Sequence, residues 1–110
     1  MCVCWLAGAL YGDGVYFARD ASYSLNYCRP DSAGLSTMYV AKVLVGNCTV
    51  GAKGMKMPPS RNNPSNPQLL YDSVVDNINN PSIYVIFADH QCYPEYLITF
   101  RSAKKNTDCY

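Results

Sequence analysis

The chain has 110 residues, of which 49% are hydrophobic and 15% are charged, and its formal net charge at pH 7 is +1. This length predicts a single domain, and this composition favours a packed core over a disordered chain. Since the sequence holds no block of like charges, it lacks the basic footprint of a nucleic-acid-binding protein, and we expect no direct binding of nucleic acid by this segment.

The first ten residues, Met1–Leu10, read MCVCWLAGAL and are apolar. They lack the positively charged start of a secretory signal peptide. They are also far too short to cross a bilayer as a helix. We therefore expect neither secretion nor a membrane contact.

The most informative stretch is Gly12–Cys28, which reads GDGVYFARDASYSLNYC. Its two glycines around an acid predict a turn. The apolar run Val15–Ala18 is long enough for one buried strand. Asp20 stands where a helix N-cap stands, so a helix is predicted up to Tyr27. Pro30 follows shortly afterwards and cannot continue that helix.

Side-chain spacing within this helix places polar and aromatic groups together. Ser24 and Tyr27 are three residues apart, and Tyr23 and Tyr27 are four apart, so they share one helical face. Together with Tyr16 on the preceding strand, they could hold a flat ligand that carries an amide, with rings for stacking and a hydroxyl for hydrogen bonding. A tyrosine-rich core without any ligand would show the same spacing, so spacing alone leaves both interpretations open.

The rest of the chain reads mainly as strands. A strand is predicted over Thr37–Gly46, and a turn with a short strand over Asn47–Gly51. Residues Ala52–Gln68 carry four prolines and predict a long loop. Three more strands are predicted at Leu69–Val75, Ile83–Ala88 and Pro94–Phe100. With about five strands and one or two helices, the fold class is α+β, a β-rich sheet that we expect to be antiparallel because no crossover helix separates the later strands.

The six cysteines and one histidine do not form a metal motif. No CxxC pair is present, so no metal site is predicted and reduced thiols are the expectation. A small secreted disulfide protein is the alternative for such a cysteine count, and six free thiols in denaturant would exclude it. The residues concerned are Cys2, Cys4, Cys28, Cys48, Cys92, Cys109 and His90.

Five ordered segments carry a resemblance to a known family. They are GVYFARDASYSLNYC, MYVAKVLVG, PPS, LYDSVVDN and NPSIYVIFADHQCYPEYLITF. Together they resemble the poly(ADP-ribose) polymerases, the diphtheria-toxin-like ADP-ribosyltransferases, and within them the macrodomain-containing mono-ADP-ribosyltransferase branch. The likeness covers about residues 11–101. It implies an atypical segment at 1–10, the C-terminal part of a catalytic domain at 11–101 and a tail at 102–110.

The resemblance implies a chemistry and a set of residues. The family transfers ADP-ribose from NAD to an acceptor protein and releases nicotinamide, without a metal. By alignment, Ser24 matches the serine that hydrogen-bonds the nicotinamide amide, and Tyr27 the tyrosine that stacks on the ring. Tyr16 matches the middle member of a His-Tyr-Glu set, and Ala18 lines the same pocket. The partners implied are NAD and acceptor proteins, and the location implied is the nucleus or the cytoplasm.

The third member of that set is the most specific expectation. Ile83 occupies the position of the family glutamate, whose carboxylate accepts a hydrogen bond from a ribose hydroxyl in polymerising members. Isoleucine cannot do this, so the resemblance implies mono-ADP-ribosylation. Glu95 is an alternative replacement, rejected because that alignment leaves the strand from Ile83 without a partner. Asp72 and Asp76 are interpreted as turn or surface residues, and the 52–68 loop as the segment that approaches the acceptor.

A second hypothesis remains open beside the enzyme. The family's His-Gly-Thr motif has no counterpart in the chain, whose lone histidine is His90 near the other end. The chain is therefore expected to be a fragment of a catalytic domain. Alone, it would be an NAD-dependent transferase of doubtful activity, or a catalytically inactive interaction module or remnant.

Overall fold

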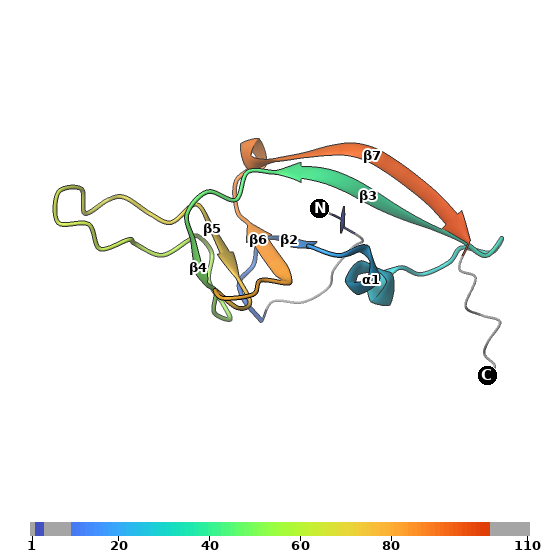
Figure 1. Cartoon of the computed structure of the whole chain (residues 1–110), viewed down its shortest axis with the longest axis horizontal. Helices are drawn as coiled ribbons and strands as arrows, with labels where there is room; N and C mark the ends of the chain where they lie inside the picture. The colour runs from blue at the N-terminus through green and yellow to red at the C-terminus, as the bar shows by residue number, and fades with distance from the viewer. Residues whose placement is uncertain (1, 4–9, 102–110) are drawn as a thin grey trace.

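The computed structural model describes residues 2–3 and 10–101. The predicted tail at 102–110 and most of the predicted segment 1–10 lie outside the described residues. Within the described part, one seven-stranded sheet has the order β4-β5-β6-β2-β1-β3-β7. The long pair β3–β7 arches over the shorter strands, with the short helix α1 below it (Figure 1). The α+β, strand-rich class predicted from the sequence is confirmed.

The strands are β1 (Cys2–Val3), β2 (Val15–Ala18), β3 (Leu35–Val43), β4 (Cys48–Val50), β5 (Ser73–Val75), β6 (Ile83–Ile86) and β7 (Cys92–Arg101). The helices are α1 (Ala21–Ser24) and the 3-10 turns η1 (Leu25–Tyr27) and η2 (Asp89–Gln91). The strand at Val15–Ala18 has the predicted bounds, whereas the predicted strand at Leu69–Val75 shortens to β5.

One predicted feature of the sheet is wrong. All the pairings are antiparallel except that of β4 with β5, which is parallel. The expectation of antiparallel neighbours rested on the absence of a crossover helix. The long irregular segment 51–72 connects β4 to β5 and returns the chain to the end of the sheet where β4 began. The strand β5 therefore runs in the same direction as β4.

The strands β2 and β6 lie at the centre of the packing. They pair in antiparallel register, with Tyr16 opposite Val85 and Ala18 opposite Ile83. Both faces of this pair are covered by apolar side chains, as the unbroken apolar run of β6 predicts. One face holds a core cluster of Tyr16, Val74, Ile83 and Val85, and the other a cluster of Phe17, Ala41 and Ile86.

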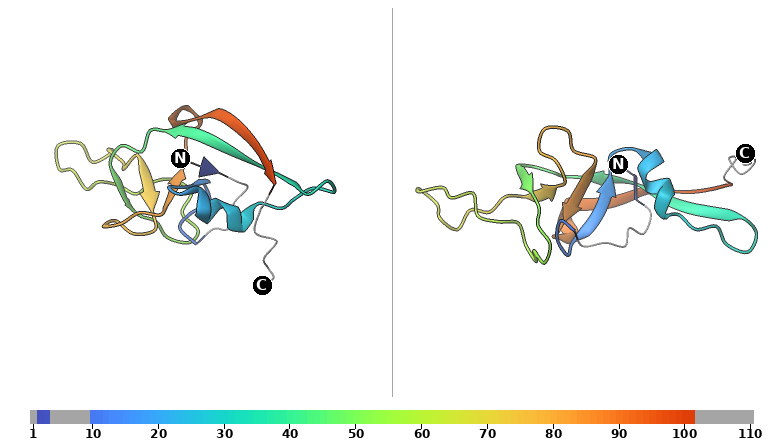
Figure 2. Two further views of the ribbon diagram at one scale, coloured as in Figure 1. Left: turned by 45° about the vertical axis from the view of Figure 1, so that its right-hand side comes forward. Right: turned by 90° about the horizontal axis from the view of Figure 1, so that it is seen from below.

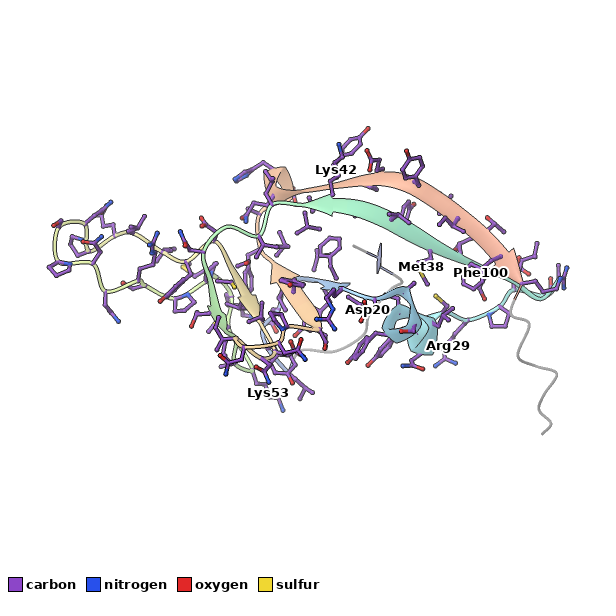
Figure 3. The ribbon with its side chains drawn as sticks, viewed as in Figure 1. Asp20, Arg29, Met38, Lys42, Lys53 and Phe100 are labelled. Atoms are coloured by element: carbon purple, nitrogen blue, oxygen red, sulfur yellow. The ribbon has the colours of Figure 1, made fainter. Side chains whose placement is uncertain are left out.

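A β-bulge in β7 lies where the alternation of buried and exposed residues in β3 changes. The register with β7 shifts between Val40 and Ala41. Before the bulge Met38 is buried, and after it Ala41 is buried while Lys42 is exposed. The unpaired extra residue is Glu95 on β7, and at the same point the buried positions of β3 change from even to odd. Figure 3 shows the consequence, with Met38 on the side of α1 and Lys42 on the outside of the arch.

The predicted helix begins where expected but is short. Asp20 has an extended backbone (φ −111°, ψ 138°) at the N-cap position, and its side chain makes no capping hydrogen bond. Its carboxylate instead pairs with Arg19 at 3.2 Å. After a single α-helical turn the backbone tightens into η1, which ends at Tyr27.

The outer part of the predicted loop at 52–68 is an irregular hairpin that projects from the body (Figure 2), whereas Lys53 lies near the lower end of β4 (Figure 3). It contributes to an elongated shape of 57 × 27 × 22 Å. Its base is tied to the Gly12 turn, because the Asp13 N–H donates to the Met55 carbonyl at 2.8 Å and Lys56 forms an ion pair with Asp13. Its arms are joined by a bridge between Ser60 and Leu70.

The cysteines follow the expectation only in part. Cys48 and Cys92 are free thiols. Cys28 is disulfide-bonded, so the prediction of reduced thiols is wrong for this residue. Across residues 2–3 and 10–101, no group of three or more potential metal-ligating side chains lies together. The same part of the chain has no helix that is long and apolar enough to span a membrane.

The edge strand β7 leads to a prediction of self-association. Leu97 is 59% exposed, pairs across to the half-exposed Tyr39, and lies on a strand whose side chains are mostly exposed. Long apolar edge strands are templates for pairing with another chain. We expect the protein to form dimers or larger species at about 100 μM. The change Leu97→Lys should shift it toward monomer in sedimentation velocity.

The matched control is Val50→Lys on β4, the opposite edge of the sheet, where Val50 is 47% exposed. This variant should associate as the wild type does. Monomeric wild-type protein at that concentration, or an effect of Val50→Lys alone, would contradict a contact through β7.

Candidate functional site

The fixed point of the candidate site is Tyr16 on β2. Its side chain is 7% exposed. Its hydroxyl donates to the Gly12 carbonyl at 2.7 Å and accepts from the Tyr11 N–H at 3.0 Å. Tyr16 is therefore held by the turn that precedes its own strand. Because backbone groups occupy the hydroxyl, the ring face is the part of Tyr16 that a ligand could use.

Ile83 and Ala18 lie beside Tyr16 on the same core face. The register sets Ile83 directly opposite Ala18, and both are buried. Ile83 shares a core cluster with Tyr16. Three of the residues predicted from the resemblance, separated by up to 67 positions, are thus brought together by one pair of strands. Their surface here is apolar.

A carboxylate stands next to Ile83 although position 83 itself carries none. The Asp76 Oδ1 atom accepts the backbone N–H groups of Ser82 at 3.0 Å and Ile83 at 3.1 Å. Asp76 is half-buried where β5 ends. The interpretation of Asp76 as a hydrogen-bonding turn residue agrees with these contacts, and they fix the start of β6.

The helical residues approach this cluster from the other side. The rings of Tyr23 and Tyr27 are stacked, with centroids 5.8 Å apart and planes inclined by 26°. Tyr23 also packs against the cluster that contains Tyr16 and Ile83. Tyr27 is 38% exposed, whereas Ser24 is fully buried. The predicted ring is thus open to solvent, and the predicted hydroxyl group is enclosed.

Tyr23 has an unusual proton affinity. A side-chain hydrogen bond with Tyr27 raises the pKa of Tyr23 to about 12, helped by burial and by the charges of Tyr27, Asp76 and Tyr11. The direction fits a Tyr23 hydroxyl that donates, since a donor in a hydrogen bond holds its proton more tightly. Tyr23 is therefore a neutral hydrogen-bonding group at physiological pH and not a base.

Glu95, the rejected alternative for the glutamate position, lies elsewhere in the sheet. It is on β7, which β1 and β3 separate from β2. Its carboxylate is 3.3 Å from the Lys42 ammonium on the outer side of the arch. Glu95 is therefore not among the residues around Tyr16, and the assignment of the glutamate position to Ile83 stays a prediction.

A hollow lies on the side of β2 opposite the Tyr16 cluster. It has a volume of about 320 Å³ and is lined by Val15, Phe17, Tyr39, Ala41, Cys92 and Pro94. The lining is mostly apolar, and burial, with a smaller effect of the Asp89 charge, raises the pKa of the Cys92 thiol. None of the predicted site residues lines this hollow, so it is distinct from the Tyr16 cluster.

Comparison with known proteins identifies the family. The family model described as "Poly(ADP-ribose) polymerase catalytic domain" matches residues 1–102. The chain belongs to this family. The match covers nearly the whole chain, which confirms the resemblance carried by the five segments.

Two relatives show which members of the poly(ADP-ribose) polymerase family are similar. The chain is 53% identical over 93 residues to protein mono-ADP-ribosyltransferase PARP14 of Homo sapiens, covering 83% of this chain and 5% of that protein. It is 44% identical over 103 residues to protein mono-ADP-ribosyltransferase PARP12 of Mus musculus, covering 94% of this chain and 14% of that protein. The chain thus spans a small part of the curated relatives it matches.

A solved structure supports the fold. The PARP domain of Arabidopsis RADICAL-INDUCED CELL DEATH1 superposes with a TM-score of 0.72 at 23% identity, covering 92% of this chain and 56% of that one. This likeness concerns the fold alone. The roles of Tyr16, Ala18, Ser24, Tyr27 and Ile83 remain predictions from the alignment.

The sequence predicted Tyr23 as a second ring on the face of Tyr27 and Asp76 as a turn or surface residue, but it did not predict that Tyr23 packs on the Tyr16 cluster or that Asp76 holds the start of β6. The four-residue spacing to Tyr27 was a usable signal for Tyr23, since such pairs meet on a helix. For Asp76 no sequence signal existed, because its contacts with Ser82 and Ile83 depend on how the chain turns between β5 and β6.

Proposed function

We propose that the chain is the nicotinamide-binding part of an NAD-dependent protein mono-ADP-ribosyltransferase. Membership of the family supports NAD as the substrate, and the names of the related mono-ADP-ribosyltransferases support mono-ADP-ribosylation of proteins. The observation that carries the proposal is the apolar Ile83 opposite Ala18, in one cluster with Tyr16.

In the proposed reaction, ADP-ribose passes from NAD to an acceptor protein in two changes at C1′ of the ribose. The bond between the nicotinamide nitrogen and C1′ of the ribose breaks, and its electron pair leaves with nicotinamide. The sugar is left as an oxocarbenium-like cation, and a nucleophilic oxygen of the acceptor protein bonds to C1′. Tyr16 and Tyr27 supply ring faces that hold the leaving group, and Ser24 supplies the hydroxyl for its amide.

Ile83 limits the reaction to one transfer in this proposal. Elongation needs a carboxylate that accepts from a hydroxyl of the ADP-ribose already attached and so activates it. The Ile83 side chain offers no acceptor. The acceptor protein's own carboxylate would then stabilise the sugar cation. The proposal places the protein inside the cell, in the nucleus or the cytoplasm.

An inactive binding module is the second candidate, and the burial of Ser24 favours it. A ligand amide reaches this hydroxyl only if the side chains that enclose Ser24 move. Such a module would bind nicotinamide weakly or not at all and would transfer nothing.

The proposal is tested first by the binding of nicotinamide and NAD, and then by the transfer of ADP-ribose to protein. We expect nicotinamide to bind in NMR titrations, and NAD to bind with a Kd weaker than about 10 μM, roughly −7 kcal/mol, in calorimetry. In a protein that joins the chain to the family's His-Gly-Thr segment, mass spectrometry should show single ADP-ribose increments at modified sites. Long polymers would contradict the assignment of Ile83 and favour Glu95 as the catalytic glutamate. The absence of both transfer and nicotinamide binding would favour the inactive module.

A substitution at position 83 sharpens this test. Ile83→Glu should not create a polymerase, because the new carboxyl would be buried beside the Asp76 carboxylate. Burial and the like charge would both raise its pKa and destabilise the fold. The control Ile83→Leu conserves volume and should leave transfer unchanged.

A further inference from the structure

Tyr23 links the two aromatic walls of the proposed nicotinamide site. Its ring stacks on Tyr27 with centroids 5.8 Å apart. The same ring packs against the core cluster of Tyr16 and Ile83. A single side chain therefore contacts both the exposed ring and the buried cluster.

The two walls are held very differently. Tyr16 is 7% exposed, and two backbone groups fix its hydroxyl. Tyr27 is 38% exposed and is the last residue of η1. An exposed ring at the end of a short helix, such as that of Tyr27, samples more orientations than a core ring such as that of Tyr16. The contact that ties it to the core then determines how often both walls face one ligand.

We propose that Tyr23 is a positioning residue that fixes the Tyr27 ring for nicotinamide. The stack sets the inclination of the ring, and the hydrogen bond between the two side chains holds it there. This inference rests on the proposed function, because it assumes that Tyr27 stacks on nicotinamide. An orientation fixed before binding saves the entropy of ordering the ring at binding.

A purely structural role is the competing explanation. Under that explanation Tyr23 only covers the Tyr16 cluster, and any side chain of similar volume would serve. The change Tyr23→Phe keeps the ring and the packing and removes the hydroxyl. The change Tyr23→Leu keeps an apolar cover and removes the stack.

The first measurement is nicotinamide affinity by NMR titration, with thermal unfolding as the control for folding. We expect about a fivefold weaker Kd for Tyr23→Phe, the loss of one hydrogen bond. For Tyr23→Leu we expect at least about tenfold, because the aromatic pair is lost as well. Wild-type affinity in a folded Tyr23→Leu variant would overturn the positioning role.

The second measurement needs no ligand. Tyrosine labelled with ¹³C at Cζ reports the ionisation of each ring separately. In the wild type Tyr23 should titrate near pH 12, and in Tyr27→Phe its pKa should fall toward 10, because the hydrogen bond with Tyr27 is the largest cause of the shift. A Tyr23 that titrates identically in both proteins would show that the two side chains are not coupled and would overturn the inference.

The two measurements separate the inference from the function on which it rests. Weaker nicotinamide binding in both Tyr23 variants, with coupled titration, supports it. Equal binding by all variants overturns the positioning role alone and leaves the proposed function standing. A wild-type chain that shows the coupled titration but no nicotinamide binding overturns the proposed function, and the positioning role with it.

Discussion

The change Gly51→Ala is expected to unfold a large fraction of the protein. A Cβ atom at position 51 would lie 2.1 Å from the Tyr11 carbonyl oxygen and 2.8 Å from the Val74 Cγ2 atom. The Gly51 N–H also donates to the Val75 carbonyl at 3.0 Å, which limits how far the backbone can shift. Forced overpacking of this kind costs about 1–3 kcal/mol or more, against a total stability of roughly 5 kcal/mol for a small domain.

The consequence should extend to the candidate site. Tyr11, which approaches Gly51, also donates its N–H to the Tyr16 hydroxyl. Displacement of Tyr11 would therefore release the group that fixes Tyr16. We expect Gly51→Ala to lower the thermal midpoint by about 10 °C or more for a chain of this size.

The matched control is Gly54→Ala in the adjacent loop. Within residues 2–3 and 10–101, no atom beyond its chain neighbours lies within 4 Å of the position that a Gly54 Cβ would take, and the penalty that remains is a positive φ of +85°. This left-handed conformation costs about 1–2 kcal/mol for alanine. Thermal unfolding followed by circular dichroism compares the two variants. A smaller effect for Gly51→Ala than for Gly54→Ala would contradict the close approach of Tyr11 and Gly51.

Local features of the fold could be read from the sequence because their causes are local. The apolar run of β2 and the N-cap position of Asp20 follow from a few neighbouring residues. The apolar run Ile83–Ala88 predicted a strand that is covered on both sides. The strand formed, β6 at Ile83–Ile86, does have side chains in both core clusters.

Features that depend on distant contacts could not be read in this way. The parallel pairing of β4 and β5 requires the course of the whole 51–72 excursion. The bulge at Glu95 of β7, opposite Val40 and Ala41, is a property of the register between β3 and β7 and cannot be seen in the sequence of either strand alone. The predicted site shows the same division. The resemblance gave the residues of the site. It did not predict the hydrogen bond from the Tyr16 hydroxyl to the Gly12 carbonyl or the stacking of Tyr23 on Tyr27.

The change Tyr16→Ala is expected to have the largest effect on the site. It removes a buried ring from the cluster with Val74, Ile83 and Val85, and it leaves the Gly12 carbonyl and the Tyr11 N–H without their hydroxyl partner. Loss of a core aromatic side chain costs about 3–5 kcal/mol. In the fraction that remains folded, loss of one stacking wall should weaken nicotinamide binding by about fivefold or more, equivalent to roughly 1 kcal/mol.

Two further variants separate the ring from the hydroxyl and stability from binding. Tyr16→Phe keeps the ring and should retain nicotinamide affinity, while the unpaired backbone groups lower stability by about 1–3 kcal/mol. Phe17→Ala removes a neighbouring core ring that faces the opposite cluster, so it should destabilise the fold comparably but leave affinity unchanged. Thermal unfolding and nicotinamide titration on the three proteins give both quantities. If Phe17→Ala weakens binding as much as Tyr16→Ala does, the loss reflects instability, and Tyr16 is not a wall of the site.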